Sequence, residues 1–167
     1  MYIDNGFLEI DELGERLPSE ERLEKGAVAV LECIQQIPCN PCQDACSRGA
    51  IQPFVSINDT PVIDMDKCNG CGNCISACPG LAIFVVWKHY SPQTSLIKMP
   101  YELLPEPEAG ETVSLVNRKG EVIGEGKVVK VQKTKQNPKS RVVWVETPKD
   151  LMMEVRHITR RENHGRK

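Results

Sequence analysis

The segment Cys68-Asn-Gly-Cys71-Gly-Asn-Cys74-Ile-Ser-Ala-Cys78-Pro79 constrains this chain more than any other. Its spacing is C-x2-C-x2-C-x3-C-P. A cubane iron–sulfur cluster has four irons, and each iron binds one thiolate. Three cysteines spaced by two residues can reach three irons from one tight loop, while the fourth cysteine turns towards a second cluster. Gly70 and Gly72 allow the backbone to approach the cluster closely. The segment therefore predicts iron–sulfur ligation.

A less regular copy of this segment lies 32 residues earlier in the chain. The stretch from Cys39 to Ile51 aligns without gaps onto the stretch from Cys71 to Ile83, and cysteine, alanine and isoleucine recur at matching positions. The copy departs from the pattern in two places. Gln36 stands where a first cysteine is expected, with Cys33 three residues earlier, and Ser47 replaces the proline after the last cysteine. The duplication predicts a pseudo-twofold unit with two clusters.

The role of Cys33 has two interpretations. In one, the first loop is longer and Cys33 still completes a [4Fe–4S] site, because three extra residues easily span the gap. In the other, Cys33 is a buried structural thiol and the first cluster is a [3Fe–4S] form or takes another ligand. We expect the first. The predicted iron ligands are Cys33, Cys39, Cys42 and Cys78 for cluster I, and Cys68, Cys71, Cys74 and Cys46 for cluster II.

Other uses of the cysteines and of the remaining polar residues fit the sequence less well. Cys-x2-Cys pairs also bind zinc, but a zinc site gains nothing from the third and fourth cysteines at this spacing. The histidines, His89, His157 and His164, are scattered, and we expect them at the surface rather than as ligands or bases. The glycines of 120–126 lack the spacing of a nucleotide-binding loop. We therefore expect no catalytic residues and a chain that is not itself an enzyme.

Composition and charge narrow the classes of function. The formal net charge is −2, whereas nucleic-acid-binding domains are usually clearly basic. Residues 1–25 carry eight acidic and three basic side chains, and residues 118–141 carry two acidic and eight basic ones, so docking faces of opposite charge are conceivable beside plain solvated surfaces. The acidic N-terminus does not resemble a signal peptide, and the apolar run 81–87 is too short to span a membrane. We expect a cytoplasmic protein, in which thiols stay reduced and disulfides are rare.

The pattern along the chain predicts five parts. The apolar and β-branched segments predict strands at 27–31, 83–87, 112–116, 126–131 and 141–145, a hairpin at 54–63 and a helix near 18–25. The segment 151–155 fits a strand or a short helix equally well. The expected parts are an acidic arm with a short helix and strand (1–32), the cysteine-rich module (33–90), a Pro-rich linker (91–110), a small antiparallel β domain resembling a barrel (111–158) and a basic tail (159–167).

Residues 33–87 resemble the bacterial dicluster ferredoxins, including Pro61-Val-Ile-Asp64 and Lys67-Cys68 before the second motif. That resemblance implies an α+β fold, with a pseudo-twofold dicluster ferredoxin module, and transfer of single electrons. A narrower resemblance rests on the long first loop, on Cys78-Pro-Gly-Leu-Ala-Ile83 and on Pro100-Tyr-Glu-Leu-Leu-Pro105. It is to the iron–sulfur subunit that accompanies FAD-containing subunits in proline, hydroxyproline or opine dehydrogenase-like complexes, and it implies FAD-containing partners.

These features favour an electron-transfer subunit of a larger oxidoreductase, which holds two [4Fe–4S] clusters and catalyses no reaction itself. The segments before and after the module carry no catalytic constellation, and such additions usually serve docking, so a hetero-oligomer is expected. Two alternatives stay open. An independent soluble ferredoxin would be a stable monomer that reduces many acceptors, and a structural or redox-sensing cluster protein would not cycle reversibly.

Overall fold

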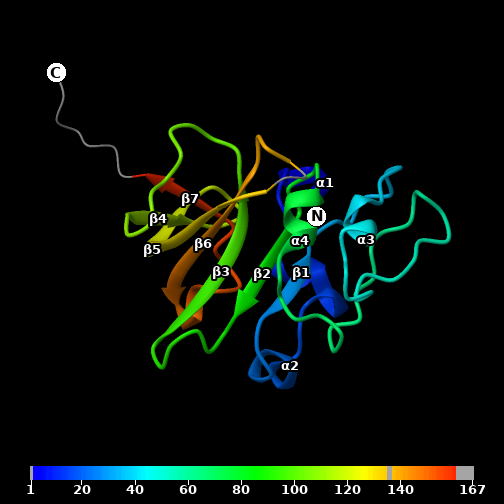
Figure 1. Cartoon of the computed structure of the whole chain (residues 1–167), viewed down its shortest axis with the longest axis horizontal. Coiled ribbons are helices and arrows are strands. Elements are labelled where there is room, and N and C mark those ends of the chain that lie inside the picture. Colours follow the sequence, from blue (N-terminus) through cyan, green and yellow to red (C-terminus); the bar gives the residue numbers. More distant parts are fainter. Residues whose placement is uncertain (1, 135–136, 161–167) are drawn as a thin grey trace.

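The computed structural model describes residues 2–134 and 137–160 and consists of one antiparallel sheet with short helices and long loops beside it (Figure 1). The strands are β1 (Val28–Leu31), β2 (Ile83–Trp87), β3 (Thr94–Tyr101), β4 (Thr112–Val116), β5 (Val122–Lys133), β6 (Arg141–Pro148) and β7 (His157–Arg160). The α-helices are α1 (Tyr2–Asn5), α2 (Glu20–Glu24), α3 (Pro41–Asp44) and α4 (Asn73–Ala77), and the 3₁₀ helices are η1 (Ile10–Arg16) and η2 (Lys149–Leu151).

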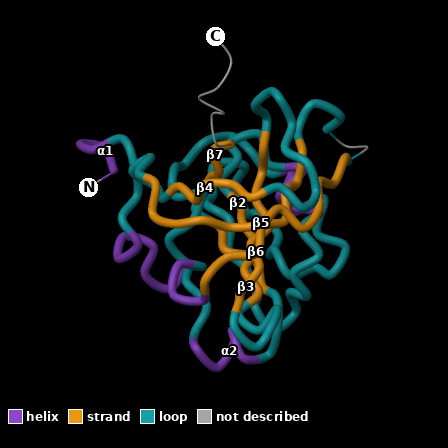
Figure 2. Tube along the Cα trace, turned by 90° about the vertical axis from the view of Figure 1, so that its left-hand side faces the viewer, coloured by secondary structure: helices purple, strands orange, loops and turns teal. Residues whose placement is uncertain are grey.

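The sheet has seven strands in the order β1-β2-β3-β6-β5-β4-β7, and each neighbouring pair is antiparallel. Its two edges, β1 and β7, are not paired with each other, so the sheet is not a closed barrel. Figure 2 shows the strands crossing the centre of the molecule and the helices near its periphery. None of the helices in the described residues is long and apolar enough to cross a membrane.

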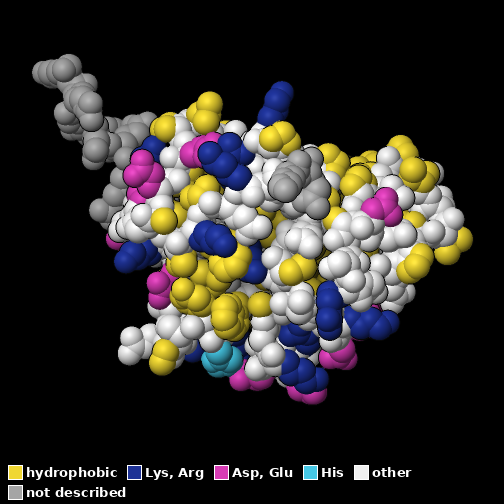
Figure 3. All heavy atoms as spheres, in the orientation of Figure 1, with side chains coloured by type: hydrophobic (Ala, Val, Ile, Leu, Met, Phe, Trp, Pro, Cys, Tyr) yellow, Lys and Arg dark blue, Asp and Glu magenta, His cyan; other side chains and the backbone are white. Residues whose placement is uncertain are grey.

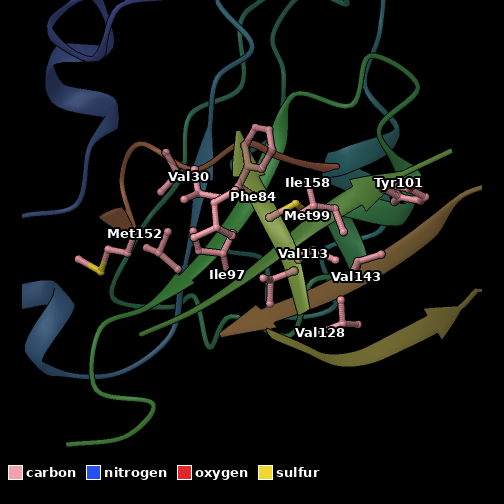
Figure 4. Packing of buried hydrophobic residues seen from close by; sticks show 14 of the residues in the cluster. Val30, Phe84, Ile97, Met99, Tyr101, Val113, Val128, Val143, Met152 and Ile158 are labelled. Atoms are coloured by element: carbon pink, nitrogen blue, oxygen red, sulfur yellow. The ribbon is translucent and has the colours of Figure 1, made fainter. Parts of the chain in front are cut away.

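One face of the sheet encloses the main apolar core (Figure 4). Side chains alternate between the two faces of a strand, so every second residue of each strand can point inward. Val30 of β1 and Ile158 of β7 belong to the same buried cluster although their strands lie at opposite edges. The sheet must therefore curl onto itself, and Phe84, Met99 and Val113 fill the space between its edges.

The opposite face of β1, β2 and β6 packs against the cysteine-rich loops. Ala29, Leu31, Ile83, Val85 and Val142 form a second buried cluster together with the thiols of Cys42, Cys74 and Cys78. Strands β1 and β2 are thus covered on both faces, and this explains why their sequences are continuous apolar runs rather than alternating ones. The cysteine-rich segment does not stand apart from the sheet, because it uses the sheet as its base.

The structure differs from the sequence-based expectation in two segments. Residues 94–101 lie within the expected linker but form β3, which pairs with both β2 and β6. The prolines of 91–110 suggested an extended spacer, yet Pro100 is accommodated opposite Val142 in the ladder. The expected hairpin at 54–63 is replaced by a loop with a single bridge between Ile51 and Ile63.

The loop at 54–63 has a local cause. The Asp59 carboxylate accepts hydrogen bonds from the backbone N–H groups of Val55, at 3.0 Å, and Ser56, at 2.7 Å. Such side-chain acceptors compete with the strand partners that a hairpin would need. Residues 151–155 lie in η2 and the turn that follows, and the last strand is β7. Residues 161–167, most of the expected basic tail, lie outside the described residues, as does His164.

A buried ion-pair network joins the start of the cysteine-rich segment to the far side of the sheet. The Glu32 carboxylate accepts hydrogen bonds from Arg118, at 2.6 and 3.0 Å, and from Arg156 Nε, at 2.6 Å. Burial by itself would raise the pKa of Glu32, but the Arg118 hydrogen bond and the charges of both guanidinium groups outweigh it, so the pKa lies below its ordinary value. Glu32 directly precedes Cys33, so this network fixes the chain where the first cysteine loop begins.

Candidate iron–sulfur sites

Four of the predicted ligands line one cavity. Cys46, Cys68, Cys71 and Cys74 surround it, and its other lining residues include Ala29, Ile51, Asn69 and Gly70. Three of these cysteines come from the segment 68–74, which leads into α4, and Cys46 comes from the end of the first motif. This is the set that the sequence assigns to cluster II. All eight cysteines of the chain are free of disulfides.

The loop that carries Cys68 is held by a buried arginine from α2. Arg22 donates hydrogen bonds to the carbonyl oxygens of Met65 and Cys68, each at 2.6 Å. It also donates to Gly26 and Ala27 at 3.1 and 3.0 Å, which ties the same loop to the entry of β1. Ser19 caps α2 by accepting from the Arg22 N–H at 3.2 Å, so the helix start and the arginine are positioned together.

Gly70 lies where no other residue fits. Its φ of +66° is in the left-handed region, and a Cβ there would lie 2.4 Å from Ala27 Cβ and 2.8 Å from the Ala27 carbonyl carbon. Gly72 also has a positive φ, of +92°, but a Cβ at that position would meet only Ile75 and Lys98, both at 3.6 Å. The close approach of the loop to the strand therefore depends on Gly70 for space and for conformation.

A buried lysine approaches the same loop from the sheet. Lys98 of β3 is only 6% exposed, and its Nζ donates to the carbonyl oxygens of Gly70, at 2.6 Å, and Cys71, at 3.4 Å. The same ammonium group lies 4.0 Å from the centre of the Trp144 ring. Burial lowers the pKa of Lys98, while the sulfur of Cys71 acts in the opposite direction. Lys98 was not among the residues predicted from the sequence, although a single charge among Leu96, Ile97 and Met99 indicates a buried polar contact.

The other four predicted ligands also lie near one another. Burial, together with the neighbouring sulfurs of Cys78, Cys33 and Cys39, raises the pKa of the Cys42 thiol to about 11. Burial likewise raises the pKa of Cys33, with contributions from Cys78 and Cys39. Cys33 therefore lies within electrostatic reach of the other three thiols. This is the set that the sequence assigns to cluster I.

The two groups of thiols adjoin each other. Burial is the largest cause that raises the pKa of the Cys74 thiol to about 12. The sulfurs of Cys68, Cys71 and Cys46 contribute to this shift, as does that of Cys42 from the other group. Thiols with such pKa values are inert as nucleophiles at neutral pH. Such buried thiols can still bind iron, because binding of the metal displaces the proton and leaves the thiolate.

Backbone N–H groups are directed at the sulfurs in both halves. In iron–sulfur proteins, hydrogen bonds of this kind stabilise the thiolates and tune the reduction potential. The donors are Ala29 and Gly70 to Cys68 Sγ, each at 3.4 Å, Ala50 to Cys46 Sγ at 3.2 Å, and Ala82 to Cys78 Sγ at 3.5 Å.

The 32-residue repeat of the sequence is also a repeat of backbone geometry. Helix α3 of the first copy corresponds to α4 of the second, and the residue three positions after the last cysteine has a positive φ in both copies, +61° at Gly49 and +54° at Leu81. Three backbone hydrogen bonds recur at the same offset. They are Gln43 N to Asn40 O, Cys46 N to Gln43 O and Gly49 N to Cys46 O in the first copy, and Ile75 N to Gly72 O, Cys78 N to Ile75 O and Leu81 N to Cys78 O in the second.

The arrangement of the thiols and histidines was also compared with that of a site for a single metal ion. Within residues 2–134 and 137–160, no three His, Cys, Asp or Glu side chains are grouped closely enough to hold one metal ion. A cubane does not require such a group, because each thiolate binds a different iron. His89 is exposed and its Nε2 lies 2.7 Å from Glu24 Oε2. His157, expected at the surface, is partly buried and stacks on Tyr101 at a centroid distance of 5.6 Å.

The second cysteine motif is similar to known iron–sulfur proteins. Residues 61–84 match the family model of the 4Fe-4S binding domain. This segment is therefore similar to a ferredoxin-type 4Fe–4S domain. It is 38% identical over 52 residues to the ferredoxin-type protein NapF of Haemophilus influenzae, which is 30% of this chain and 30% of that protein. Against NapF of Escherichia coli the identity is 39% over 57 residues, or 33% of this chain and 35% of NapF.

A further relative is named as one of the subunits of a reductase. The chain is 39% identical over 70 residues to this component of the selenate reductase of Mesobacillus selenatarsenatis, covering 42% of this chain and 23% of that protein. The chain thus matches about a third or less of the length of these relatives, and the similarity concerns the cysteine-rich segment rather than the whole protein. No solved structure matches the chain significantly. The comparisons support an iron–sulfur protein of electron transport.

Proposed function

We propose that this chain relays single electrons through two [4Fe–4S] clusters as a non-catalytic subunit of a multisubunit oxidoreductase. Cys33, Cys39, Cys42 and Cys78 would hold cluster I, and Cys68, Cys71, Cys74 and Cys46 would hold cluster II. The observation that carries the proposal is the crossed grouping of the thiols. Each group combines three cysteines of one motif with the last cysteine of the other, as a dicluster arrangement requires.

The donor set suits such clusters. Four thiols line the cavity of the second site, glycine backbone forms its wall, and N–H groups are directed at the sulfurs of Cys46 and Cys68. A [4Fe–4S] cluster, when bound, supplies a centre that accepts and donates one electron. The residues of the chain hold it, exclude water by packing Ile51 and Ile75 beside the thiols, and tune its potential by hydrogen bonds and charge.

The adjacency of the two thiol groups supports a relay rather than two independent stores. Cys42 of the first group contributes to the raised pKa of Cys74 in the second, and both thiols belong to one buried apolar cluster. Two clusters held by these sulfurs would be neighbours inside the protein. An electron that enters at one cluster could then leave from the other without crossing solvent.

The partner is a separate part of the proposal. The relatives from a selenate reductase and from a dissimilatory-type sulfite reductase are each named as one subunit of the enzyme, and this supports a hetero-oligomer. A flavin-containing dehydrogenase as the partner rests on the resemblance of the long first loop and the flanking segments alone. The sheet from β3 to β7, which carries no thiol, is surface that a free carrier would not need.

The test of the clusters is iron and sulfide content, with electron paramagnetic resonance (EPR) of anaerobically purified protein before and after dithionite reduction. We expect equal iron and sulfide in the amount of two [4Fe–4S] clusters, and a reduced spectrum of two interacting centres that disappears on reoxidation and returns on a second reduction. Half that iron, or a three-iron signal in the oxidised protein, would contradict the assignment for cluster I. Clusters that cannot be cycled reversibly would favour a structural or sensing role.

The test of the partner is purification from the native host with a tag on this chain, followed by measurement of bound flavin. A stoichiometric larger subunit is expected, and flavin in that subunit would support a dehydrogenase partner. Recovery of this chain alone, still reversibly reducible, would instead support an independent ferredoxin. Recovery of a larger partner subunit without bound flavin would indicate an oxidoreductase other than a flavin-containing dehydrogenase.

A further inference from the structure

Three cationic and aromatic side chains form a row on the outer face of the sheet, beside the loop of the second site. In the ladder, Lys98 of β3 lies opposite Trp144 of β6, and Trp144 lies opposite Lys130 of β5. The Lys98 Nζ is 4.0 Å from the centre of the Trp144 ring, and the Lys130 Nζ is 5.0 Å from it. The row brings two positive charges to one indole, on the side of the sheet that faces the thiols.

Only Lys98 of this row donates to the predicted ligand loop. Its Nζ donates to Gly70 O at 2.6 Å and to Cys71 O at 3.4 Å, beside the cysteines that line the cavity. Lys98 is 6% exposed, whereas Lys130 is exposed to solvent. Two carbonyl oxygens and an aromatic face are the partners that an ammonium ion prefers, so the site is built to keep a positive charge out of water.

We propose that Lys98 sets the reduction potential of cluster II by holding a buried positive charge against the Gly70–Cys71 loop. This inference rests on the proposed function, because it assumes a cluster at the second site. Reduction adds one negative charge to a cluster, and a nearby cation stabilises the reduced form more than the oxidised one. A buried charge is screened little by salt, so its effect exceeds that of an exposed lysine at a similar distance.

The role differs from that of Arg22, which also contacts this loop. Arg22 donates to four backbone carbonyls around the Cys68 end and fixes the loop to β1. Lys98 contacts the middle of the loop, and the sulfurs of Cys71, Cys68 and Cys74 all act on its ammonium group. Lys98 therefore acts by placing a positive charge beside the loop. Its removal should alter the reduction potential of cluster II more than it alters the assembly of that cluster.

The experiment is an anaerobic redox titration of the full-length protein followed by EPR, for the wild type, Lys98→Gln and Lys130→Gln. Glutamine keeps a donor for the Gly70 carbonyl and removes the charge. In Lys98→Gln we expect the equilibrium constant for reduction of one cluster to fall at least tenfold, about 59 mV for a one-electron couple, while the other cluster is unchanged. Lys130→Gln, the matched control beside the same Trp144 ring, should shift neither potential by half as much.

Several outcomes would overturn the inference. They are an unchanged potential in Lys98→Gln, equal shifts of both clusters, and an equal shift in Lys130→Gln. If Lys98→Gln fails to load a cluster, Lys98→Met is titrated in its place, and loss of the same cluster in both variants would assign Lys98 to holding the loop instead. A wild-type protein without two reversible clusters would contradict the proposed function. If the wild-type clusters are reduced and reoxidised reversibly but the potential of Lys98→Gln is unshifted, only this inference is contradicted.

Discussion

The two cysteine loops repeat one pattern in sequence but are supported very differently. The loop from Cys68 to Cys74 is contacted from three sides, by Arg22 from α2, by Lys98 from β3 and by Ala27 at Gly70. The loop from 33 to 42 is longer and has fewer partners among the described residues. Within it, Cys39 N bonds to Ile57 O at 3.1 Å, and the loop that supplies this acceptor lies at the surface.

The surface around the first loop reflects this difference. Ile37, Val55, Ile57 and Val62 are 43 to 100% exposed. In Figure 3 the right-hand end of the molecule, where Figure 1 places the loops around α3, shows hydrophobic side chains at its rim and few charged ones. The comparison indicates that the protein preorganises the second site more than the first, so a cluster bound at the first site would have to supply more of the local order. Four substitutions test this difference between the two loops.

Gly70→Ala should have the largest effect. The new Cβ would overlap Ala27 and would sit at a φ of +66°, so the strain of a left-handed residue, about 1–2 kcal/mol, adds to an overpacking cost of about 1–3 kcal/mol. We expect the variant to lose cluster II, with about half of the iron, and to unfold at clearly lower denaturant concentration. Iron content, EPR and anaerobic denaturant titration measure these effects.

Gly49→Ala is the matched control for that substitution. Gly49 has nearly the same φ, +61°, but a Cβ there would meet no atom within 4 Å. The control therefore carries the backbone strain without the steric overlap, and it should cost about 1 kcal/mol while both clusters remain. Equal losses in the two glycine variants would show that the second loop is not held more tightly than the first.

Cys33→Ala tests the first site. The Cys33 thiol lies near those of Cys78 and Cys39, so its removal should eliminate cluster I or convert it to a three-iron form and leave cluster II intact. The iron content and the oxidised EPR spectrum report the change. Cys71→Ala is the mirror-image control and should affect cluster II alone. An unchanged iron content and spectrum in Cys33→Ala would remove this residue from the ligand set.

Glu32→Gln tests the network that anchors the start of the first loop. The variant leaves Arg118 and Arg156 buried without their counter-charge, and we expect a loss of about 3 kcal/mol in the free energy of unfolding near neutral pH. Because the folded-state pKa of Glu32 lies below its ordinary value of 4.5, the carboxylate stabilises the fold above that pH and loses this effect as the pH falls through the folded pKa. The gap between wild type and variant should therefore narrow below about pH 4.5.

Glu154→Gln is the control for this charge network. Glu154 lies 3.6 Å from Arg118, and its side chain is 45% exposed. Because Glu154 stays largely solvated, its pair with the buried Arg118 should contribute only about 1 kcal/mol. Denaturant unfolding of both variants over the same pH range separates the buried pair from the partly exposed one. A Glu154→Gln loss as large as that of Glu32→Gln would contradict the anchoring role of the buried network.

The cysteine grouping could be proposed from the sequence, whereas the frame around it could not. The spacing of Cys68 to Cys78 depends on local loop geometry, and the offset of 32 residues is visible in the letters alone. The contacts of Arg22 with Met65 and of Lys98 with Gly70 join segments 28 or more residues apart, and no local pattern encodes which carbonyl a buried cation will find. The sequence likewise predicted a linker where β3 lies. The burial of this strand depends on its pairing with the distant strand β6, which no local pattern shows.

Leu81→Gly should have the smallest effect. Leu81 has a φ of +54°, because the repeat imposes on it the conformation that Gly49 adopts in the first half. Glycine would relieve about 1–2 kcal/mol of strain but would lose a partly buried side chain and gain entropy in the unfolded state. We expect a net change within about 1 kcal/mol of the wild type. Leu81→Ala removes the same side chain beyond Cβ and keeps the strain, so Leu81→Gly should be the more stable of the two by about 1 kcal/mol in denaturant unfolding. If alanine were as stable as glycine, Leu81 would not be strained, and the second half would be no less relaxed than the first.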